Sequence, residues 1–221
     1  MHSEPALCRS LVHQTGYATV RNVEPNELTT IAETFGNITS DPRNPFQIRD
    51  IRPTPIDTAP PNTLSNLHGI SAFPFHTDCA HWEIPANFLF LYCVSPGYGA
   101  RPTHLIDSQV WPWSESELHS LKNDVWTRGL KNPKLCTVVD SSLGKDFFRF
   151  DRACMKPKSR HAQTSLTAIR EKIDASEVTT ILWSAKLLLI VDNHRLLHSR
   201  GISLVTDLDR LHQRLLIGGK P

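Results

Sequence analysis

The 221-residue sequence has no apolar segment long enough to cross a membrane. Its longest apolar stretches, residues 88–94 and 187–191, are far shorter than the ~20 residues that a transmembrane helix needs. The first eleven residues also lack the basic segment and apolar core that mark a secretion signal. We therefore expect no membrane partner and a cytoplasmic location.

Two other features that would suggest a different class of protein are also missing. The five cysteines are odd in number and none forms a C-x-x-C pair, which disfavours a disulfide framework and a structural zinc knuckle. The 24 basic and 22 acidic residues are interspersed, so no extended field of one sign is available to hold nucleic acid. The expected partner is a small molecule, and the oligomeric state stays open.

The composition is that of a folded chain, with 39% hydrophobic and 21% charged residues. A length of 221 residues suits one domain that covers residues 1–221. We expect an N-terminal scaffold made of a strand at 17–20 and a helix over 25–35. A proline-rich loop follows at 41–61, and the core runs from about 64 to 221.

Short apolar runs bounded by turn residues dominate the core, a pattern that is typical of antiparallel strands. We expect strands at 73–75, 88–94, 103–106, 186–192 and 211–217, and a hairpin made of 137–139 and 147–150. We also expect two helices, one that begins at Ser114 and one that covers 165–173. The predicted fold class is mainly β with flanking helices, as an antiparallel sandwich or a jelly-roll barrel.

The most informative local motif is an H-x-D at the end of the run 73–75. Side chains two residues apart in a strand point to the same face, so His76 and Asp78 could reach one metal ion. This motif alone is weak, because so short a pattern often arises by chance. His198 follows an apolar strand and a turn, and it would complete a two-histidine, one-carboxylate set that leaves positions on ferrous iron open for a co-substrate and dioxygen.

Two arginines, Arg210 and Arg214, follow His198 at a spacing that puts both on one side of a strand. A guanidinium holds a carboxylate with two parallel hydrogen bonds, so either arginine suits the distal carboxylate of a dicarboxylic acid such as 2-oxoglutarate. Arg210 could instead form a surface ion pair, and Arg214 a structural one. Thr103 could add a hydroxyl contact to the same carboxylate. Arg149 either meets a substrate carboxylate or lies on a solvated hairpin face.

In their order along the chain, four segments resemble the taurine dioxygenase/clavaminate synthase superfamily of iron(II)- and 2-oxoglutarate-dependent oxygenases: Phe75–Asp78, Gly99–Thr103, Val191–His198 and Arg210–Pro221. The resemblance implies a double-stranded β-helix core of the jelly-roll, cupin-like kind. It also implies that His76, Asp78 and His198 bind Fe(II). Thr103 and Arg210 would bind 2-oxoglutarate, and Arg214 would lie near the co-substrate or the substrate.

The sequence departs from the pattern of that superfamily in two places. Gly99-Ala100-Arg101-Pro102 stands where a Gly-Gly pair usually precedes the threonine, which bears on the contact made by Thr103. The chain is also shorter than typical members, which suggests a reduced lid over the substrate.

The resemblance implies a dioxygenase that consumes O₂ and 2-oxoglutarate, releases succinate and CO₂, and oxidises an unactivated C–H bond of a small molecule. Hydroxylation of an amino acid or an amino-acid-derived intermediate of specialised metabolism is the first expectation, and desaturation, cyclisation or epoxidation stay open. In the resembled superfamily a smaller residue at the position of Asp78 opens a site for chloride, so the aspartate here implies that halogenation is not expected. The alternatives outside this class are a zinc-dependent hydrolase that uses the same ligands and a non-catalytic jelly-roll binding protein.

Overall fold

The structure is a computed structural model that describes residues 4–42, 45–61, 63–98, 101–203, 207 and 209–221. Its helices are α1 (Glu4–Thr15), the 3-10 turn η1 (Pro25–Glu27), α2 (Leu28–Glu33), α3 (Leu64–His68), the 3-10 turn η2 (Ser108–Val110), α4 (Glu115–Asn123) and α5 (Arg160–Ala175). Its strands are β1 (Tyr17–Val20), β2 (Arg49–Ile51), β3 (Phe73–His76), β4 (Phe88–Ser95), β5 (Thr103–Asp107), β6 (Trp126–Arg128), β7 (Lys134–Cys136), β8 (Val139–Asp140), β9 (Phe147–Phe148), β10 (Met155–Pro157), β11 (Thr179–Ile181), β12 (Leu188–Asp192), β13 (Leu196–Arg200) and β14 (Leu211–Ile217).

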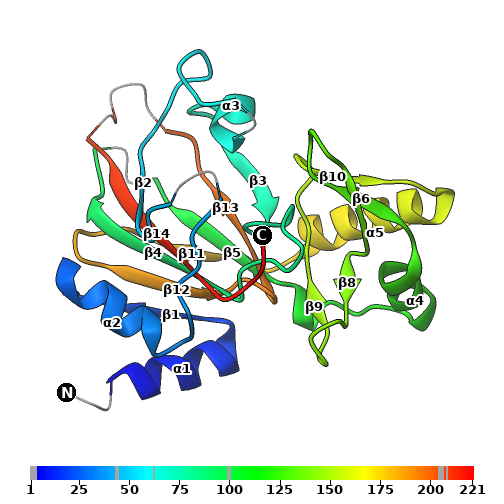
Figure 1. Cartoon of the computed structure of the whole chain (residues 1–221), viewed down its shortest axis with the longest axis horizontal. Coiled ribbons are helices and arrows are strands. Elements are labelled where there is room, and N and C mark those ends of the chain that lie inside the picture. The colour runs from blue at the N-terminus through cyan, green and yellow to red at the C-terminus, as the bar shows by residue number, and fades with distance from the viewer. Residues whose placement is uncertain (1–3, 43–44, 62, 99–100, 204–206, 208) are drawn as a thin grey trace.

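Two antiparallel sheets form the centre of the molecule. The larger has the strand order β1-β12-β4-β14-β2, and the smaller has the order β11-β5-β13-β3. From β11 to β14, consecutive strands alternate between the sheets: the chain passes from β11 in the smaller sheet to β12 in the larger one, then to β13 in the smaller one and back to β14 in the larger one. Figure 1 shows the two sheets side by side, with α1 and α2 against the larger one.

The larger sheet is buried on both faces, and β12 shows how. Leu188 and Ile190 belong to the cluster that packs against α1 and α2. Leu189 and Val191 alternate with them and join the cluster between the two sheets. Each such side chain contributes about 1.5–3 kcal/mol by leaving water. The strand therefore reads as a continuous apolar run, because neither of its faces meets solvent.

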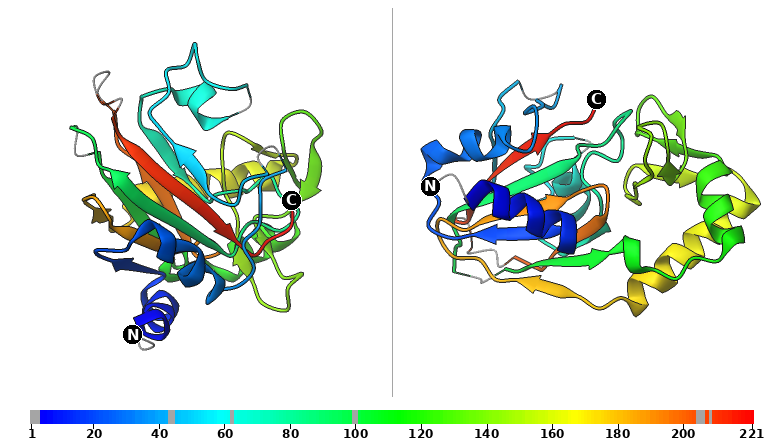
Figure 2. Two further views of the ribbon diagram at one scale, coloured as in Figure 1. Left: turned by 60° about the vertical axis from the view of Figure 1, so that its left-hand side comes forward. Right: turned by 90° about the horizontal axis from the view of Figure 1, so that it is seen from below.

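A second lobe holds α4, α5 and the three-stranded sheet β10-β6-β7, and it lies to one side of the two central sheets (Figures 1 and 2). Its core includes Trp126, Phe150 and Ile169, which are fully buried. α5 begins five residues before the predicted 165–173 segment, because the Ser159 hydroxyl accepts a hydrogen bond from the backbone N–H of Ala162 and caps the helix.

The predicted elements compare well with these bounds. The strands at 17–20 and 211–217 are confirmed at both ends, and the helix that begins after Ser114 is confirmed with its predicted cap. The predicted 25–35 helix is instead divided into η1 and α2 and ends at Glu33. The proline-rich segment 41–61 contains β2, which lies at the edge of its sheet, where proline neighbours are tolerated.

Helix α1 was not predicted. It buries Cys8 and Val12, while Leu7 and Leu11 stay exposed, so its apolar residues do not mark one face. Gly99 and Ala100 of the predicted co-substrate segment lie outside the described residues. Within the described ranges, none of the helices combines the length and the apolar character that a membrane span requires.

Candidate metal and co-substrate site

His76 and His198 lie directly opposite each other on the paired strands β3 and β13. Their rings are 4.3 Å apart between centroids. Opposed residues of an antiparallel pair project to the same face of the sheet, which is why two residues 122 positions apart in sequence become neighbours (198 − 76). The structure therefore brings together the two histidines that the sequence singled out.

The surroundings of the two imidazoles suit metal ligation. Nδ1 of His76 lies 2.8 Å from the carbonyl oxygen of Pro74, so it carries the proton and leaves Nε2 free to bind a metal. Nδ1 of His198 is buried and has no hydrogen-bond partner among the described residues. Burial, helped by the nearby His76, lowers the pKa of His198 to about 3. A neutral imidazole is the form that ligates metals.

Asp78 is the third predicted ligand, and its carboxylate forms an ion pair with Arg214. Nη1 of Arg214 lies 2.8 Å from Oδ2 and 3.1 Å from Oδ1. Burial works to raise the pKa of Asp78, but Arg214, His198 and His76 together hold it at about 2. Over the described parts of the chain, no three His, Cys, Asp or Glu side chains form a ready cluster for a metal. Asp78 lines the same cavity as both histidines, with its charge balanced by Arg214.

Asn193 fixes the backbone of Asp78. Its side-chain oxygen accepts a 2.7 Å hydrogen bond from the N–H of Asp78, and its amide donates to the carbonyl oxygens of Asp78 at 2.9 Å and of Ala86 at 2.8 Å. The side chain is fully buried in the turn between β12 and β13. The hairpin that carries His198 thus also positions the predicted carboxylate ligand. Sequence reasoning treated Asn193 as a turn residue only.

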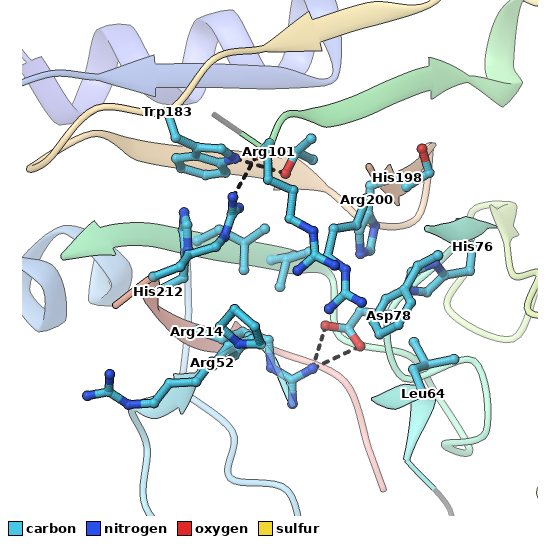
Figure 3. Close-up of a pocket in the computed structure, with 18 residues that line it drawn as sticks. Arg52, Leu64, His76, Asp78, Arg101, Trp183, His198, Arg200, His212 and Arg214 are labelled. Atoms are coloured by element: carbon cyan, nitrogen blue, oxygen red, sulfur yellow. Dashed lines mark hydrogen bonds and ion pairs between the residues drawn. The ribbon is translucent and has the colours of Figure 1, made fainter. Parts of the chain in front are cut away.

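Two adjoining cavities meet at these residues. The small cavity has a volume of about 120 Å³ and the large cavity about 620 Å³. His76, Asp78 and Arg214 line both cavities, whereas His198 lines the small one. Figure 3 shows the small cavity, with Arg200 from β13 and Arg214 from β14 among the side chains that line it. The candidate metal ligands therefore stand where one bound molecule could meet another.

Thr103 and Arg210, the predicted 2-oxoglutarate residues, both line the small cavity and are both buried. The Thr103 hydroxyl accepts a 3.1 Å hydrogen bond from the indole N–H of Trp183. Because an indole N–H can only donate, the hydroxyl proton of Thr103 stays available for an anion. Nη1 of Arg210 donates to the carbonyl oxygen of Arg101 at 2.8 Å, which holds the guanidinium at the cavity wall.

The small cavity also contains side chains that sequence reasoning did not assign to the site, namely Arg101, Arg200, His212 and Trp183. Burial, followed by the charges of Arg101 and Arg210, lowers the pKa of Arg200 to about 8. Of the described residues, five arginines and one carboxylate, that of Asp78, line the cavity, so it carries an excess of positive charge. Arg200 could have been found in the sequence, because it lies two residues after His198 and so on the same face of a strand. Trp183 lies outside any strand and offered no such signal.

Arg149 lies away from both cavities. It is only 1% exposed, and its guanidinium donates to the carbonyl oxygens of Trp82 and Glu83 and to the Asp140 carboxylate. These contacts tie the β8–β9 hairpin to the segment after β3. Neither the suggested substrate contact nor the alternative of a solvated hairpin face describes this position, and we assign Arg149 a structural role.

The residues present fit a ferrous ion. Two imidazoles and one carboxylate are the donor set of non-heme iron sites that keep coordination positions open. Nδ1 of His198, buried without a partner among the described residues, is also what is expected where a bound group completes the structure.

No protein-family model and no curated protein sequence matches this chain. Solved structures do match. An asparagine oxygenase in complex with Fe(II), 2S,3S-3-hydroxyasparagine and succinate has a TM-score of 0.80 at 16% identity, covering 98% of this chain and 79% of its own. The chain has the fold of a non-heme iron oxygenase.

Another such oxygenase, OrfP, in complex with Fe, succinate and (3S)-hydroxy-L-Arg, has a TM-score of 0.79 at 15% identity and covers 99% of this chain and 80% of its own. Its complex with Fe and alpha-ketoglutaric acid has a TM-score of 0.77 at 15% identity, with 98% and 80% covered. These likenesses confirm the predicted fold class, a mainly β, cupin-like core with flanking helices. At such identities they establish the fold, and the function rests on the site.

Substituting Asn193 by alanine tests the support of Asp78. Asn193→Ala leaves the buried N–H of Asp78 without its acceptor, so we expect the free energy of unfolding to fall by about 1–3 kcal/mol. Loss of this support should also weaken Mn²⁺ binding by about 10–100-fold. Urea unfolding and calorimetric titration with Mn²⁺ measure the two effects. Asn123→Ala, on the exposed face of α4, is the matched control and should change neither. Unchanged Mn²⁺ binding in Asn193→Ala would contradict the role given to Asn193.

The buried histidines predict a loss of stability in mild acid. Burial is the main cause that lowers the pKa of His194 to about 4 and those of His198 and His212 to about 3. Below pH ~6.5 the unfolded chain takes up protons that the folded chain does not, so the free energy of unfolding should fall between pH ~6.5 and ~4. The slope could reach about 4 kcal/mol per pH unit if all three contribute.

Urea unfolding in the presence of a chelator at several pH values across this range measures the effect. His212→Asn should flatten the dependence. Constant stability from pH ~7.5 to ~5 would show that these histidines titrate normally in the folded chain.

Proposed function

We propose that the protein is an Fe(II)- and 2-oxoglutarate-dependent dioxygenase that hydroxylates an amino acid or a closely related small molecule. The observation that carries this proposal is the position of His76, Asp78 and His198 at a cavity lined by Thr103 and Arg210. The shared fold with non-heme iron oxygenases supports it.

In this proposal His76, Asp78 and His198 hold Fe(II), and Thr103 and Arg210 hold the distal carboxylate of 2-oxoglutarate. Iron, when bound, supplies the activation of O₂ that converts 2-oxoglutarate to succinate and CO₂ and oxidises a C–H bond of the substrate. The protein orients both organic molecules and excludes water from the buried site. Hydroxylation is the simplest outcome, and desaturation or cyclisation would use the same residues.

Arg214 gains a second role when a cation occupies the site. A metal bound to Asp78 takes over the charge that Arg214 balances in this structure. Nη1 of Arg214 could then turn to an anionic group of the co-substrate or the substrate, since Arg214 lines both cavities.

The large cavity suits a zwitterionic substrate. It is lined by Arg214 and by Asp151, side chains of opposite charge. Asp151 is 9% exposed, accepts a 2.8 Å hydrogen bond from the N–H of Ala153, and takes part in none of the ion pairs found among the described residues. A carboxylate so placed favours an ammonium group in the cavity. The matched structures contain hydroxylated asparagine and hydroxylated arginine, which supports an amino-acid substrate.

The cover of the large cavity comes from the proline-rich segment 41–61 and from α3. Residues of both line the cavity, including Arg52, Pro60 and Leu64. We propose that the lining residues of these two segments form the lid over the bound substrate. The single domain over residues 1–221, the small-molecule partner and the cytoplasmic location stay predictions.

Turnover under air tests the reaction class. The full chain with Fe²⁺ and 2-oxoglutarate should release succinate, faster when an accepted amino acid is added, and should lose this activity in the His198→Ala variant. Succinate by mass spectrometry and O₂ uptake measure it. A zinc hydrolase or a binding protein would consume neither O₂ nor 2-oxoglutarate. Absence of iron-dependent succinate release, with and without a panel of free amino acids, would contradict the oxygenase proposal.

Asp151→Asn tests the substrate class. Removing the carboxylate charge should raise KM for the accepted amino acid by about tenfold or more, because a charge-assisted hydrogen bond contributes about 1.5–3 kcal/mol. The rate of succinate release without amino acid should change little. Asp50→Asn, another carboxylate that lines the large cavity, is the matched control. Equal KM values in the wild type and in Asp151→Asn would show that Asp151 does not contact the substrate.

A further inference from the structure

Arg200 occupies a central position in the small cavity. It lies opposite Thr103 on β5 and opposite Phe73 on β3. Opposed residues share a face of the sheet, and His198, two residues earlier on β13, projects to the same face. Arg200 therefore lies beside Thr103, whose hydroxyl is proposed to bind 2-oxoglutarate, and it is two residues along β13 from the His76–His198 pair. Figure 3 shows its side chain beside His198 in the cavity.

The guanidinium of Arg200 is only partly satisfied by the protein. Nη2 donates to the carbonyl oxygens of Gly69 at 2.8 Å and of Ser71 at 3.1 Å. Cζ lies 3.3 Å from the centroid of the Phe73 ring, which holds the plane of the group. Nε is buried and has no hydrogen-bond partner among the described residues. Buried donors are almost always paired, so an unused one that lines a cavity indicates a ligand.

The positive charge around Arg200 also favours the binding of an anion. Five arginines line the small cavity, namely Arg52, Arg101, Arg200, Arg210 and Arg214, and the carboxylate among its lining residues is Asp78, which Arg214 balances. Asp207, which does not line the cavity, interacts electrostatically with Arg210 and Arg101. Arg101 donates to the carbonyl oxygens of Gly201 and Ile70, and these dipoles satisfy its donors without neutralising its charge. Within the described residues Arg200 has no carboxylate of its own, as no ion pair includes it.

A second unpaired donor or acceptor lies in the same cavity. Nε2 of His212 is buried and has no partner among the described residues, and its ring packs at 4.5 Å against Trp183, which hydrogen-bonds Thr103. Arg200 and His212 come from different sheets, and both line the small cavity.

We propose that Arg200 is a second guanidinium of the co-substrate clamp, and that together with Arg210 and Thr103 it makes the site require a 2-oxo acid with a distal carboxylate. The identity of the dicarboxylate as 2-oxoglutarate rests on the proposed function. The competing interpretation is that Arg200 only ties β13 to the segment 69–71 through its backbone contacts. The two interpretations differ in what happens to a ligand without the second carboxylate.

Binding of two 2-oxo acids to the full chain loaded with Mn²⁺ distinguishes the two interpretations of Arg200. Isothermal titration under anaerobic conditions compares 2-oxoglutarate with 2-oxopentanoate, which has the same carbon chain and no distal carboxylate. Arg200→Gln should lose about tenfold or more in affinity for 2-oxoglutarate, whereas its affinity for 2-oxopentanoate should change by less than about twofold. Arg200→Lys keeps the charge without the planar fork, and its preference for 2-oxoglutarate should lie between those of the wild type and Arg200→Gln.

Arg170→Gln is the matched control, because Arg170 is exposed on α5 and lines neither cavity, so its removal takes away one positive charge without touching the site. It should keep the wild-type preference. Arg200→Gln could weaken the binding of both ligands equally, or keep the preference for 2-oxoglutarate while unfolding at a lower temperature. Either result would show that Arg200 is a structural tie and would overturn the proposal. If Arg200→Gln does not fold, an unchanged preference in Arg200→Lys overturns it. A wild type that binds 2-oxoglutarate no better than 2-oxopentanoate would overturn the proposed function itself.

Discussion

The pairing of β13 with its two neighbours is the constraint on which the site depends. β13 lies between β5 and β3, and its register against β5 runs without interruption from Leu196 to Arg200. Side chains alternate with a period of two, so a slip of one residue would turn both His198 and Arg200 away from the cavity. The Arg195–Asp107 ion pair, at the end where the two strands begin their pairing, holds this register. The pairing of β13 with β3, which positions His76, shifts register between His198 and Arg200, so strict alternation is broken in that segment.

The same hairpin governs the carboxylate. Asn193 reaches from the β12–β13 turn to both backbone polar groups of Asp78, and the next residue, Cys79, has a positive φ of 58°. A non-glycine residue in that region is held there by its surroundings at a cost of about 1 kcal/mol or more. The backbone thus leaves its strand abruptly after β3 and directs Asp78 toward Arg214 and the cavity. One turn therefore sets the positions of two candidate ligands that are 120 residues apart (198 − 78).

Strand alternation alone predicted that His76 and Asp78 share a face and that Arg210 and Arg214 share a side, because it requires only local sequence. Placing His198 at the same site rested on the order of the motifs and on the resemblance. What strand alternation could not supply is register between strands that are distant in the chain. Thr103 and Arg200 are partners only because β5 and β13 pair as they do. The buried role of Arg149 depends on carbonyl groups of residues 82 and 83, which no local pattern connects to it. Helix α1 was missed for a different reason, since its apolar residues are divided between a buried and an exposed face.

The distribution of charge makes the two cavities suitable for different ligands. The small cavity is rich in guanidinium groups, which suits a molecule that carries two carboxylates. The large cavity adds Asp151 to its basic residues, which suits a molecule with groups of both signs. Asp78 and Arg214 lie on the shared wall and balance each other. A metal bound there changes that balance for both cavities at once, because it removes the partner of Arg214 and adds positive charge beside Arg200 and Arg210. Metal binding should therefore favour anions in the small cavity, and a site with these charges gains most from a ligand that brings two of them.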